Sequence, residues 1–391
     1  MSDASRGGWA TLTAAAAAAV IIGFASTILI IMQAAQAVGA STAQQASWAA
    51  VLCYAMAVTT AILCWCYKMP IITAWSTPGA VLIASSATGI TYQAALGAFV
   101  VAGILMVITG LVKPLERAIE KMPSAIAAAM LAGVLISYVL KVPSASLTAP
   151  WLVAPLVLAF FAMRIFLPLY AVPVIVLFGL AIAFVSGQIG QACCTLGLSP
   201  LTFDVPQFQW HAVIGLGVPL YLVTIASQNI PGFAVMRAAG YQPPVSGALL
   251  VTGVCSALMA PFGGHAINMA AITASLAVGP DAHPDAMQRW KIMFPYFVMY
   301  GLIGLAAASF VQILGALPKE LVAAIAGLAL FGPLMGGMIA MLKEPNDIEA
   351  ALLTFLVTAS GFSFYGVGAA FWGLCAGLSL WVVKKAIPSP L

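Results

Sequence analysis

The sequence predicts an all-α polytopic membrane protein. Of its 391 residues, 63% are hydrophobic and 6% are charged, whereas a soluble domain carries roughly 25% charged residues. The apolar residues form long runs, and the first of them, 11–35, is long enough to span a bilayer. That run lacks the short core and cleavage site of a signal peptide, so we expect it to be retained as a membrane helix.

We count fourteen apolar runs and predict that each forms a membrane segment. The runs are 11–35, 48–66, 70–87, 93–112, 123–140, 149–163, 168–186, 212–232, 245–260, 263–278, 293–315, 321–342, 347–360 and 363–383. Several are shorter than the roughly 20 residues that a full membrane helix needs. These short runs are predicted to be half-helices or kinked segments.

The basic residues support this count. If the N-terminus is cytoplasmic and every run crosses, twelve of the fourteen Lys and Arg residues lie inside, and only Lys141 and Lys319 lie outside. Membrane proteins usually carry such an excess of Lys and Arg in their cytoplasmic loops. A twelve-crossing alternative would place several of these loops outside. We therefore expect both termini in the cytoplasm.

An internal repeat is visible at one spacing. Gln33 in IIMQAAQ and Gln228 in IASQNIP lie 195 positions apart, as do Pro123 in KMPSAIAAAML and Pro318 in ALPKELVAAIAG. A repeat of seven segments is odd, so the two halves must have opposite orientations in the membrane. Transporters with such inverted repeats bind their solute between the repeats, near the middle of the bilayer.

The third run has the features of a helix that starts inside the membrane. Residues 70–75 are rich in β-branched and aromatic side chains and predict a short extended stretch. Ser76 or Thr77 then suits a helix N-cap, and Pro78 suits the first helical position. A helix N-terminus presents unpaired N–H groups and a positive dipole end, both of which favour an anion.

The tenth run is predicted to supply a matching half-helix. Gly263 and Gly264 indicate extended chain that turns into a helix N-terminus at His265. Two such ends would form a positive pocket without any arginine or lysine. In the eighth run, we expect Pro231 to break the helix next to the polar residues 227–229, since broken membrane helices persist only inside protein or along a cavity.

The candidate substrate-binding residues come from these segments and the end of the first run. They are Gln33, Trp75, Ser76, Thr77, Pro78, Gly79, Ser227, Gln228, Asn229, Gly263, Gly264, His265, Ala266 and Asn268. Buried amides also serve as hydrogen bonds between helices, and membrane tryptophans as interfacial anchors. Trp75 is nevertheless suited to stack on a flat substrate.

His265 is the ionisable residue that we place within the membrane. All ten acidic residues fall in loops or at segment ends, which argues against an enzyme with paired carboxylates. His265 is therefore the candidate for proton coupling, because imidazole titrates nearest to neutral pH. Its structural alternative is a neutral ring bonded to backbone carbonyls. The cysteines show no metal-site spacing, so we expect no metal and no cofactor.

Three motifs carry a resemblance to a known family. TAWSTPGAVLIAS, TIASQNIPGFAV and FGGHAINMAAITA resemble the benzoate/proton symporter family, and more distantly nucleobase and sulphate-type carriers of the seven-plus-seven inverted-repeat fold. The likeness covers essentially the whole chain. It implies a core domain and a gate domain. The core would comprise 1–112 and 212–316, the gate 113–190 and 317–391, and an external linker 191–211.

The resemblance implies a secondary transporter in a bacterial inner membrane that imports an aromatic carboxylate, benzoate, together with protons. Nucleobase carriers have glutamates where this chain has Gln228 and His265, and this difference favours an anion. The alternative is a transporter or channel for another small anion or an uncharged aromatic such as a nucleobase. Expected partners are the aromatic anion, protons, the lipid bilayer and a possible second copy in a homodimer. The scattered basic residues form no nucleic-acid patch.

Overall fold

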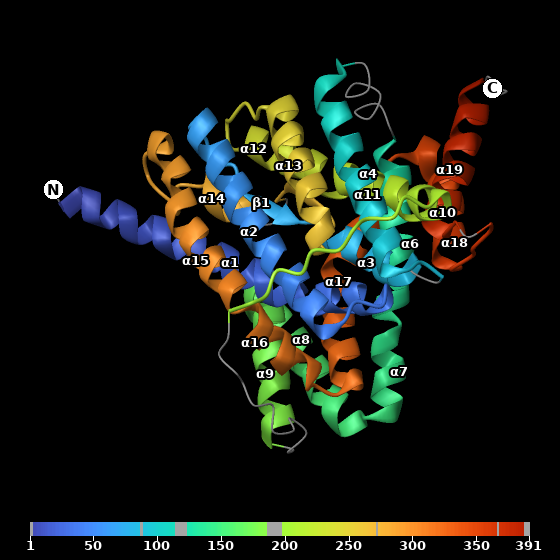
Figure 1. Ribbon diagram of the computed structural model, residues 1–391, viewed down its shortest axis with the longest axis horizontal. Coiled ribbons are helices and arrows are strands. Elements are labelled where there is room, and N and C mark those ends of the chain that lie inside the picture. The colour runs from blue at the N-terminus through green and yellow to red at the C-terminus, as the bar shows by residue number, and fades with distance from the viewer. Residues whose placement is uncertain are drawn as a thin grey trace.

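The computed structural model describes residues 3–86, 89–113, 123–185, 198–270, 273–365 and 367–386, and these are mostly helical (Figure 1). In the first half the elements are α1 (Asp3–Ala37), α2 (Thr42–Tyr67), β1 (Thr73–Trp75), α3 (Thr77–Ser86), α4 (Tyr92–Leu111), α6 (Ser124–Val139), α7 (Lys141–Thr148), α8 (Pro150–Phe166), η1 (Pro168–Tyr170) and α9 (Ala171–Val185).

The second half follows a similar order. Its elements are α10 (Trp210–Ala212), η2 (Val213–Gly217), α11 (Val218–Thr224), η3 (Ile225–Asn229), α12 (Ile230–Ala238), α13 (Val245–Met259), η4 (Ala260–Phe262), β2 (Ile267–Met269), α14 (Ala274–Val278), η5 (Ala286–Ile292), α15 (Met293–Leu305), α16 (Ala307–Gly315), α17 (Lys319–Met341), η6 (Pro345–Asp347), α18 (Ile348–Ala359) and α19 (Ala369–Ala386).

Among the described residues, seven helices are long and apolar enough to cross a membrane. An eighth candidate is the pair formed by η5–α15 and α16, which is bent by 56° at Ala306. Every predicted run contains a helix, but several of these helices are short, such as α3 with ten residues and α14 with five. The number of fourteen crossings therefore stays a prediction.

The eighth run is a continuous helix from Trp210 to Ala238, so the break predicted at Pro231 is wrong. Two π turns, η2 and η3, lie within this helix. Pro231 lacks the N–H that an α-helix would bond to residue 227. Because η3 ends just before it, the wider turn accommodates the proline without ending the helix. Such π turns are frequent at functional sites.

The two halves meet in a short antiparallel strand pair. β1 and β2 pair with Thr73 opposite Met269 and Trp75 opposite Ile267. The extended stretch predicted before Ser76 is thus confirmed. The extended stretch predicted before His265 is wrong, because β2 follows that residue and α14 begins only at Ala274.

The two glycines of the tenth run explain this error. Gly263 has φ +102°, the left-handed conformation that ends a helix, and closes the turn after η4. A Cβ at this position would lie 3.0 Å from Cβ of Trp48 on α2. The glycines therefore end the preceding helix against α2, instead of starting the next one.

The helices pack in two groups. In the first, α4 packs on α13, α2 on α15, and α1 on α3. In the second, α6 packs on α17 and α18, α18 on α19, and α8 on α9. Figure 1 shows α2 and α15 on one side of the molecule, α13 near its middle, and α18 and α19 on the other side. Helices α1 and α3 contact the second group through α9, α17 and α6.

Residues 198–209 form an extended segment across the first group (Figure 1). Its backbone bonds to both halves of the chain: the Asp204 N–H donates to the Pro261 carbonyl at 2.9 Å, and the Gln207 N–H to the Gln93 carbonyl at 2.9 Å. The Thr202 N–H donates to the Ser47 hydroxyl at 3.0 Å. This segment belongs to the predicted linker 191–211, whose first residues, 191–197, lie outside the described part.

Candidate functional site

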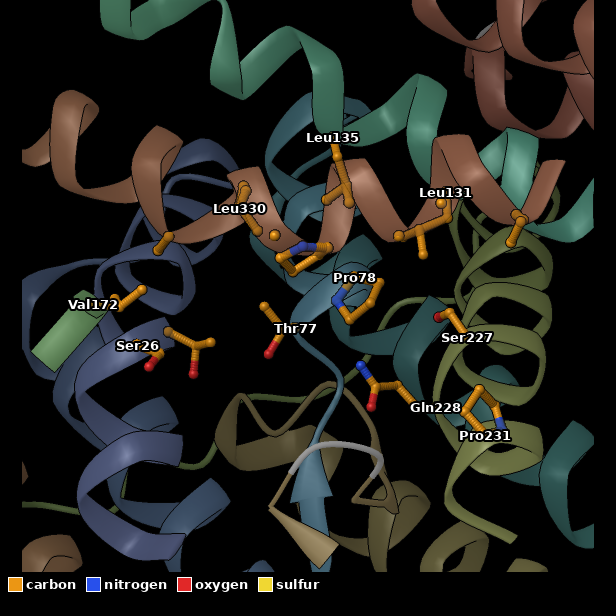
Figure 2. Close-up of a pocket in the computed structure, with 18 of the residues that line it drawn as sticks. Ser26, Thr77, Pro78, Leu131, Leu135, Val172, Ser227, Gln228, Pro231 and Leu330 are labelled. Carbon is orange, nitrogen blue, oxygen red and sulfur yellow. The ribbon is translucent and has the colours of Figure 1, made fainter. Parts of the chain in front are cut away.

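A cavity of about 680 Å³ lies where the two helix groups meet. The N-terminal turn of α3 and the η3 turn line it from one side, and α6, α8, α9 and α17 from the other. Figure 2 shows Thr77, Pro78 and Gln228 at one end of this space, with Leu131, Leu135 and Leu330 above them. Most of the wall is apolar, so the few polar side chains determine how a ligand can be oriented.

Ser76 holds the start of α3 in place. Its side chain accepts from the Gly79 N–H at 3.1 Å, which confirms the predicted N-cap. The same hydroxyl accepts from the Thr224 hydroxyl of α11 at 2.9 Å. The Ser76 N–H donates to the Ala266 carbonyl at 3.0 Å. Ser76 therefore joins α3, α11 and the chain before β2, and it is fully buried behind the cavity wall.

The η3 turn separates two adjacent amides. Asn229 is buried, and its Oδ1 accepts from the Met269 N–H of β2 at 2.9 Å. Gln228 lines the cavity instead, and Figure 2 shows its carboxamide directed toward Thr77. Within the described chain, neither the Gln228 carboxamide nor the Thr77 hydroxyl has a hydrogen-bond partner. Both are thus available to a ligand.

The α1 side of the cavity contributes two further hydroxyls, from Ser26 and Thr27. The indole N–H of Trp75 donates to Oγ1 of Thr27 at 2.7 Å. Trp75 itself is buried, and its ring packs against Phe24 and Tyr300. The side chain predicted to stack on the substrate therefore fixes a residue of the cavity wall.

His265 lies between Trp48 of α2 and Ser76 at the start of α3, and it is fully buried. The indole N–H of Trp48 donates to its Nδ1 at 3.1 Å, and its Nε2 lies 3.0 Å from the Ser76 carbonyl. Nδ1 accepts, so the hydrogen must be on Nε2, which donates to Ser76. The ring is therefore neutral in this arrangement and makes no contact with the cavity.

Four predicted residues line the cavity: Thr77, Pro78, Ser227 and Gln228. The remaining ones do not, and they support the wall from behind or lie elsewhere: Trp75, Ser76, Gly79, Asn229, Gly263, Gly264, His265, Ala266, Asn268 and Gln33. Asn268 is one of the supporting residues. With its side-chain amide oriented so that oxygen and nitrogen each find a partner, it accepts from the Ser76 N–H at 3.1 Å and donates to the Ala74 carbonyl at 3.3 Å.

Gln33 belongs to a second, smaller pocket. That pocket has a volume of about 290 Å³ and is also lined by Gln36, Gln45 and Lys319. It lies at the ends of α1 and α16 and the start of α17, and it shares no lining residue with the main cavity.

The expectation of a pocket without arginine or lysine, formed by two helix N-termini, is wrong. Of the two, the N-terminus of α3 lines the cavity, whereas the short α14 does not. The positive charge comes from Arg164, in the last turn of α8. Hydropathy predicts a loop at Arg164, because this residue follows directly after the apolar run 149–163. A signal was available in the sequence. Phe160 lies four positions earlier and therefore on the same face of α8, and it also lines the cavity.

Comparisons with known proteins agree with the membrane architecture. The family described as benzoate membrane transport protein matches residues 8–383. The chain is 38% identical to inner membrane protein YdcO of Escherichia coli (strain K12), covering 94% of both chains. It is 33% identical to the benzoate membrane transport protein of Acinetobacter baylyi, covering 94% of this chain and 93% of that one.

Two solved structures share the fold at low sequence identity. The transmembrane domain of a cyanobacterium bicarbonate transporter, BicA, has a TM-score of 0.58 and 16% identity, covering 95% of this chain and 97% of that one. The murine Solute Carrier 26 family member A9 anion transporter in the inward-facing state has a TM-score of 0.63 and 13% identity, covering 96% and 68%. These relatives and neighbours are transporters or membrane proteins, as predicted, and not enzymes.

Proposed function

The chain belongs to the benzoate membrane transport protein family, and on this premise we propose that it imports benzoate or a similar aromatic carboxylate across the bacterial inner membrane. The family makes it an integral membrane transporter. The substrate, the coupling to protons and the transport cycle are our proposals.

The polarity of the cavity is the observation that carries the substrate proposal. Its volume of about 680 Å³ lies in the ordinary range for small-molecule sites, about 300–1,000 Å³. The aromatic ring would occupy the part lined by Leu131, Leu135 and Leu330. The carboxylate would accept from Thr77 and Gln228, and the dipole at the N-terminal end of α3 would favour the anion by about 0.3–1 kcal/mol.

The position of the cavity supports an alternating-access cycle. The binding groups come from α3 and η3, whereas the facing wall comes from α6, α8 and α17. We assign the first group to the predicted core domain and the second to the gate domain. Movement of the core against the gate would then carry Thr77, Gln228 and the bound anion together, while the apolar gate wall slides past the ring.

Proton coupling is proposed to involve His265. An imidazolium has no acceptor nitrogen, so a proton on Nδ1 cannot coexist with donation from Trp48. Uptake of a proton therefore requires the two side chains to separate. Because Nε2 bonds to Ser76 at the start of α3, such a rearrangement would reach the cavity wall directly.

Uptake into proteoliposomes tests this function. Labelled benzoate should accumulate, and an inward proton gradient should accelerate it. Unlabelled benzoate should compete well, benzamide poorly because it lacks the charge, and bicarbonate poorly because it lacks a ring to fill the apolar wall. Equal competition by benzamide and benzoate would contradict an anion site. An uptake rate that does not change with the proton gradient would contradict proton coupling.

A further inference from the structure

Arg164 is a positive charge in the wall of an otherwise neutral cavity. It sits in the last turn of α8 and lines the cavity. Its guanidinium carbon lies 5.1 Å from the ring centre of Phe331 and 5.9 Å from that of Phe160. Its Nη2 lies 3.8 Å from the sulfur of Met335. These partners hold the side chain in place, and none of them carries a negative charge.

Its charge is left without a counterion by the described residues. The described residues contain one ion pair, between Lys384 and Glu349, and it lies on α18 and α19, away from Arg164. Aromatic faces attract a cation by about 0.5–1 kcal/mol at an exposed site and by about 2 kcal/mol or more when it is desolvated. A thioether adds only a weak acceptor. A half-buried guanidinium with such partners retains most of its capacity to bind an anion, since it offers five N–H donors in a planar fork.

We propose that Arg164 is the residue that selects for charge in the substrate: it binds the carboxylate at the α8 side of the cavity as the anion moves to or from Thr77 and Gln228. This role rests on the proposed function. Phe160 and Phe331 keep the guanidinium extended along the wall, so that the anion exchanges one set of donors for another inside a single apolar space.

The two aromatic neighbours argue for arginine rather than for any cation. A guanidinium is planar and can lie on two phenyl rings while its edge remains free for a carboxylate, whereas an ammonium is a strongly hydrated point charge. The backbone of α17 lies beside this group: a Cβ at Gly332 would be in ordinary van der Waals contact with Nη1 of Arg164, at 3.5 Å.

Binding of two matched ligands to purified protein tests the proposal. Arg164→Gln should weaken benzoate about tenfold while changing benzamide less than about twofold, because the neutral amide gains little from the charge. The benzoate effect should shrink at high salt, which screens a partly exposed charge. Arg164→Lys should keep the preference for benzoate but bind it more weakly than the parent protein.

Lys343→Gln is the matched control, since it removes an exposed cation just beyond α17 and outside the cavity. It should leave both affinities unchanged. The proposal is overturned if Arg164→Gln keeps the parent's preference for benzoate, or if it weakens both ligands equally, as a loss of packing would. Failure of the parent protein to bind benzoate would instead overturn the proposed function. If the Gln variant does not fold, the Lys variant decides: a lost preference for benzoate despite the retained charge overturns the role.

Discussion

Trp48 and His265 share one hydrogen bond that determines the state of the imidazole. The indole N–H of Trp48 donates to Nδ1 at 3.1 Å, so the ring must donate from Nε2 to the Ser76 carbonyl. The two rings also pack with Phe99 of α4 in one buried aromatic cluster. A change in the protonation of His265 would therefore be transmitted to both α2 and α3.

His265→Gln should remove the pH dependence of benzoate binding, because a glutamine side chain cannot take up a proton. A glutamine can still donate to the Ser76 carbonyl, so some binding should remain. Affinity should be measured at several pH values and corrected for the ionised fraction of the ligand. A variant with the parent's pH profile would show that the proton is carried elsewhere.

Trp48→Phe tests the same bond from the other side. Phenylalanine fills much of the same space but cannot donate, so the neutral ring loses one stabilising partner. A hydrogen bond of about 0.5–1.5 kcal/mol corresponds to a shift of about 0.4–1 pH unit. We expect the pH midpoint of benzoate binding to move toward higher pH. Trp151→Phe, at an exposed position on α8, should leave the midpoint unchanged.

Gln228→Glu should weaken benzoate binding about 10- to 100-fold. It replaces a donor by a carboxylate that repels the substrate, and hydrogen bonds to charged groups contribute about 1.5–3 kcal/mol. Direct binding to purified protein is the measurement. Gln36→Glu, outside the main cavity, is the matched control and should bind normally. Similar losses in both variants would mean that Gln228 does not contact the anion.

Ser76→Ala should destabilise the fold by about 1 kcal/mol from loss of the helix cap, and further because the Thr224 hydroxyl loses its acceptor. Thermal unfolding in detergent measures the change. In combination with Thr224→Val the two effects should be less than additive, since both act on one bond. The control Ser144→Ala, exposed on α7, should have little effect. Full additivity would contradict the shared bond.

Gly103→Ala should lower the unfolding temperature, whereas Gly301→Ala should not. A Cβ at Gly103 would lie 2.6 Å from the backbone nitrogen of Ala257, because α4 and α13 pack with their backbones in close approach. At Gly301 on α15 nothing lies within 4 Å, and alanine is the better helix former. An equal response of the two variants would refute the close packing of these helices.

Local patterns in the sequence predicted the first half of the site. The β-branched stretch before Ser76 and the cap both act within a few residues, and the structure contains each of them. Pro78 lies at the second helical position instead of the first, because Ser76 is the cap and the helix begins at Thr77. The same reasoning failed at Gly263 because a glycine permits both a helix start and a helix end. Contact with Trp48, about 215 positions away, decides between them.

The remainder of the site depends on packing between helices. Gln228 and Asn229 are equivalent as a sequence pattern, and a π turn directs one to the cavity and the other to β2. Arg164 was missed because hydropathy assigns a charge after an apolar run to a loop. Two phenyl rings from α8 and α17 instead hold it against the wall.

The strand pair has a consequence for the biosynthesis of the protein. Thr73 and Met269 are register partners, yet 196 positions separate them in the chain. At about 5–20 residues per second, a ribosome needs about 10–40 s to complete the second strand after the first. During that interval the backbone groups of β1 have no strand to pair with, and hydrocarbon would leave them unsatisfied. The first half therefore needs other hydrogen-bond partners for β1 during this interval, and its fold is complete only after β2 has been synthesised.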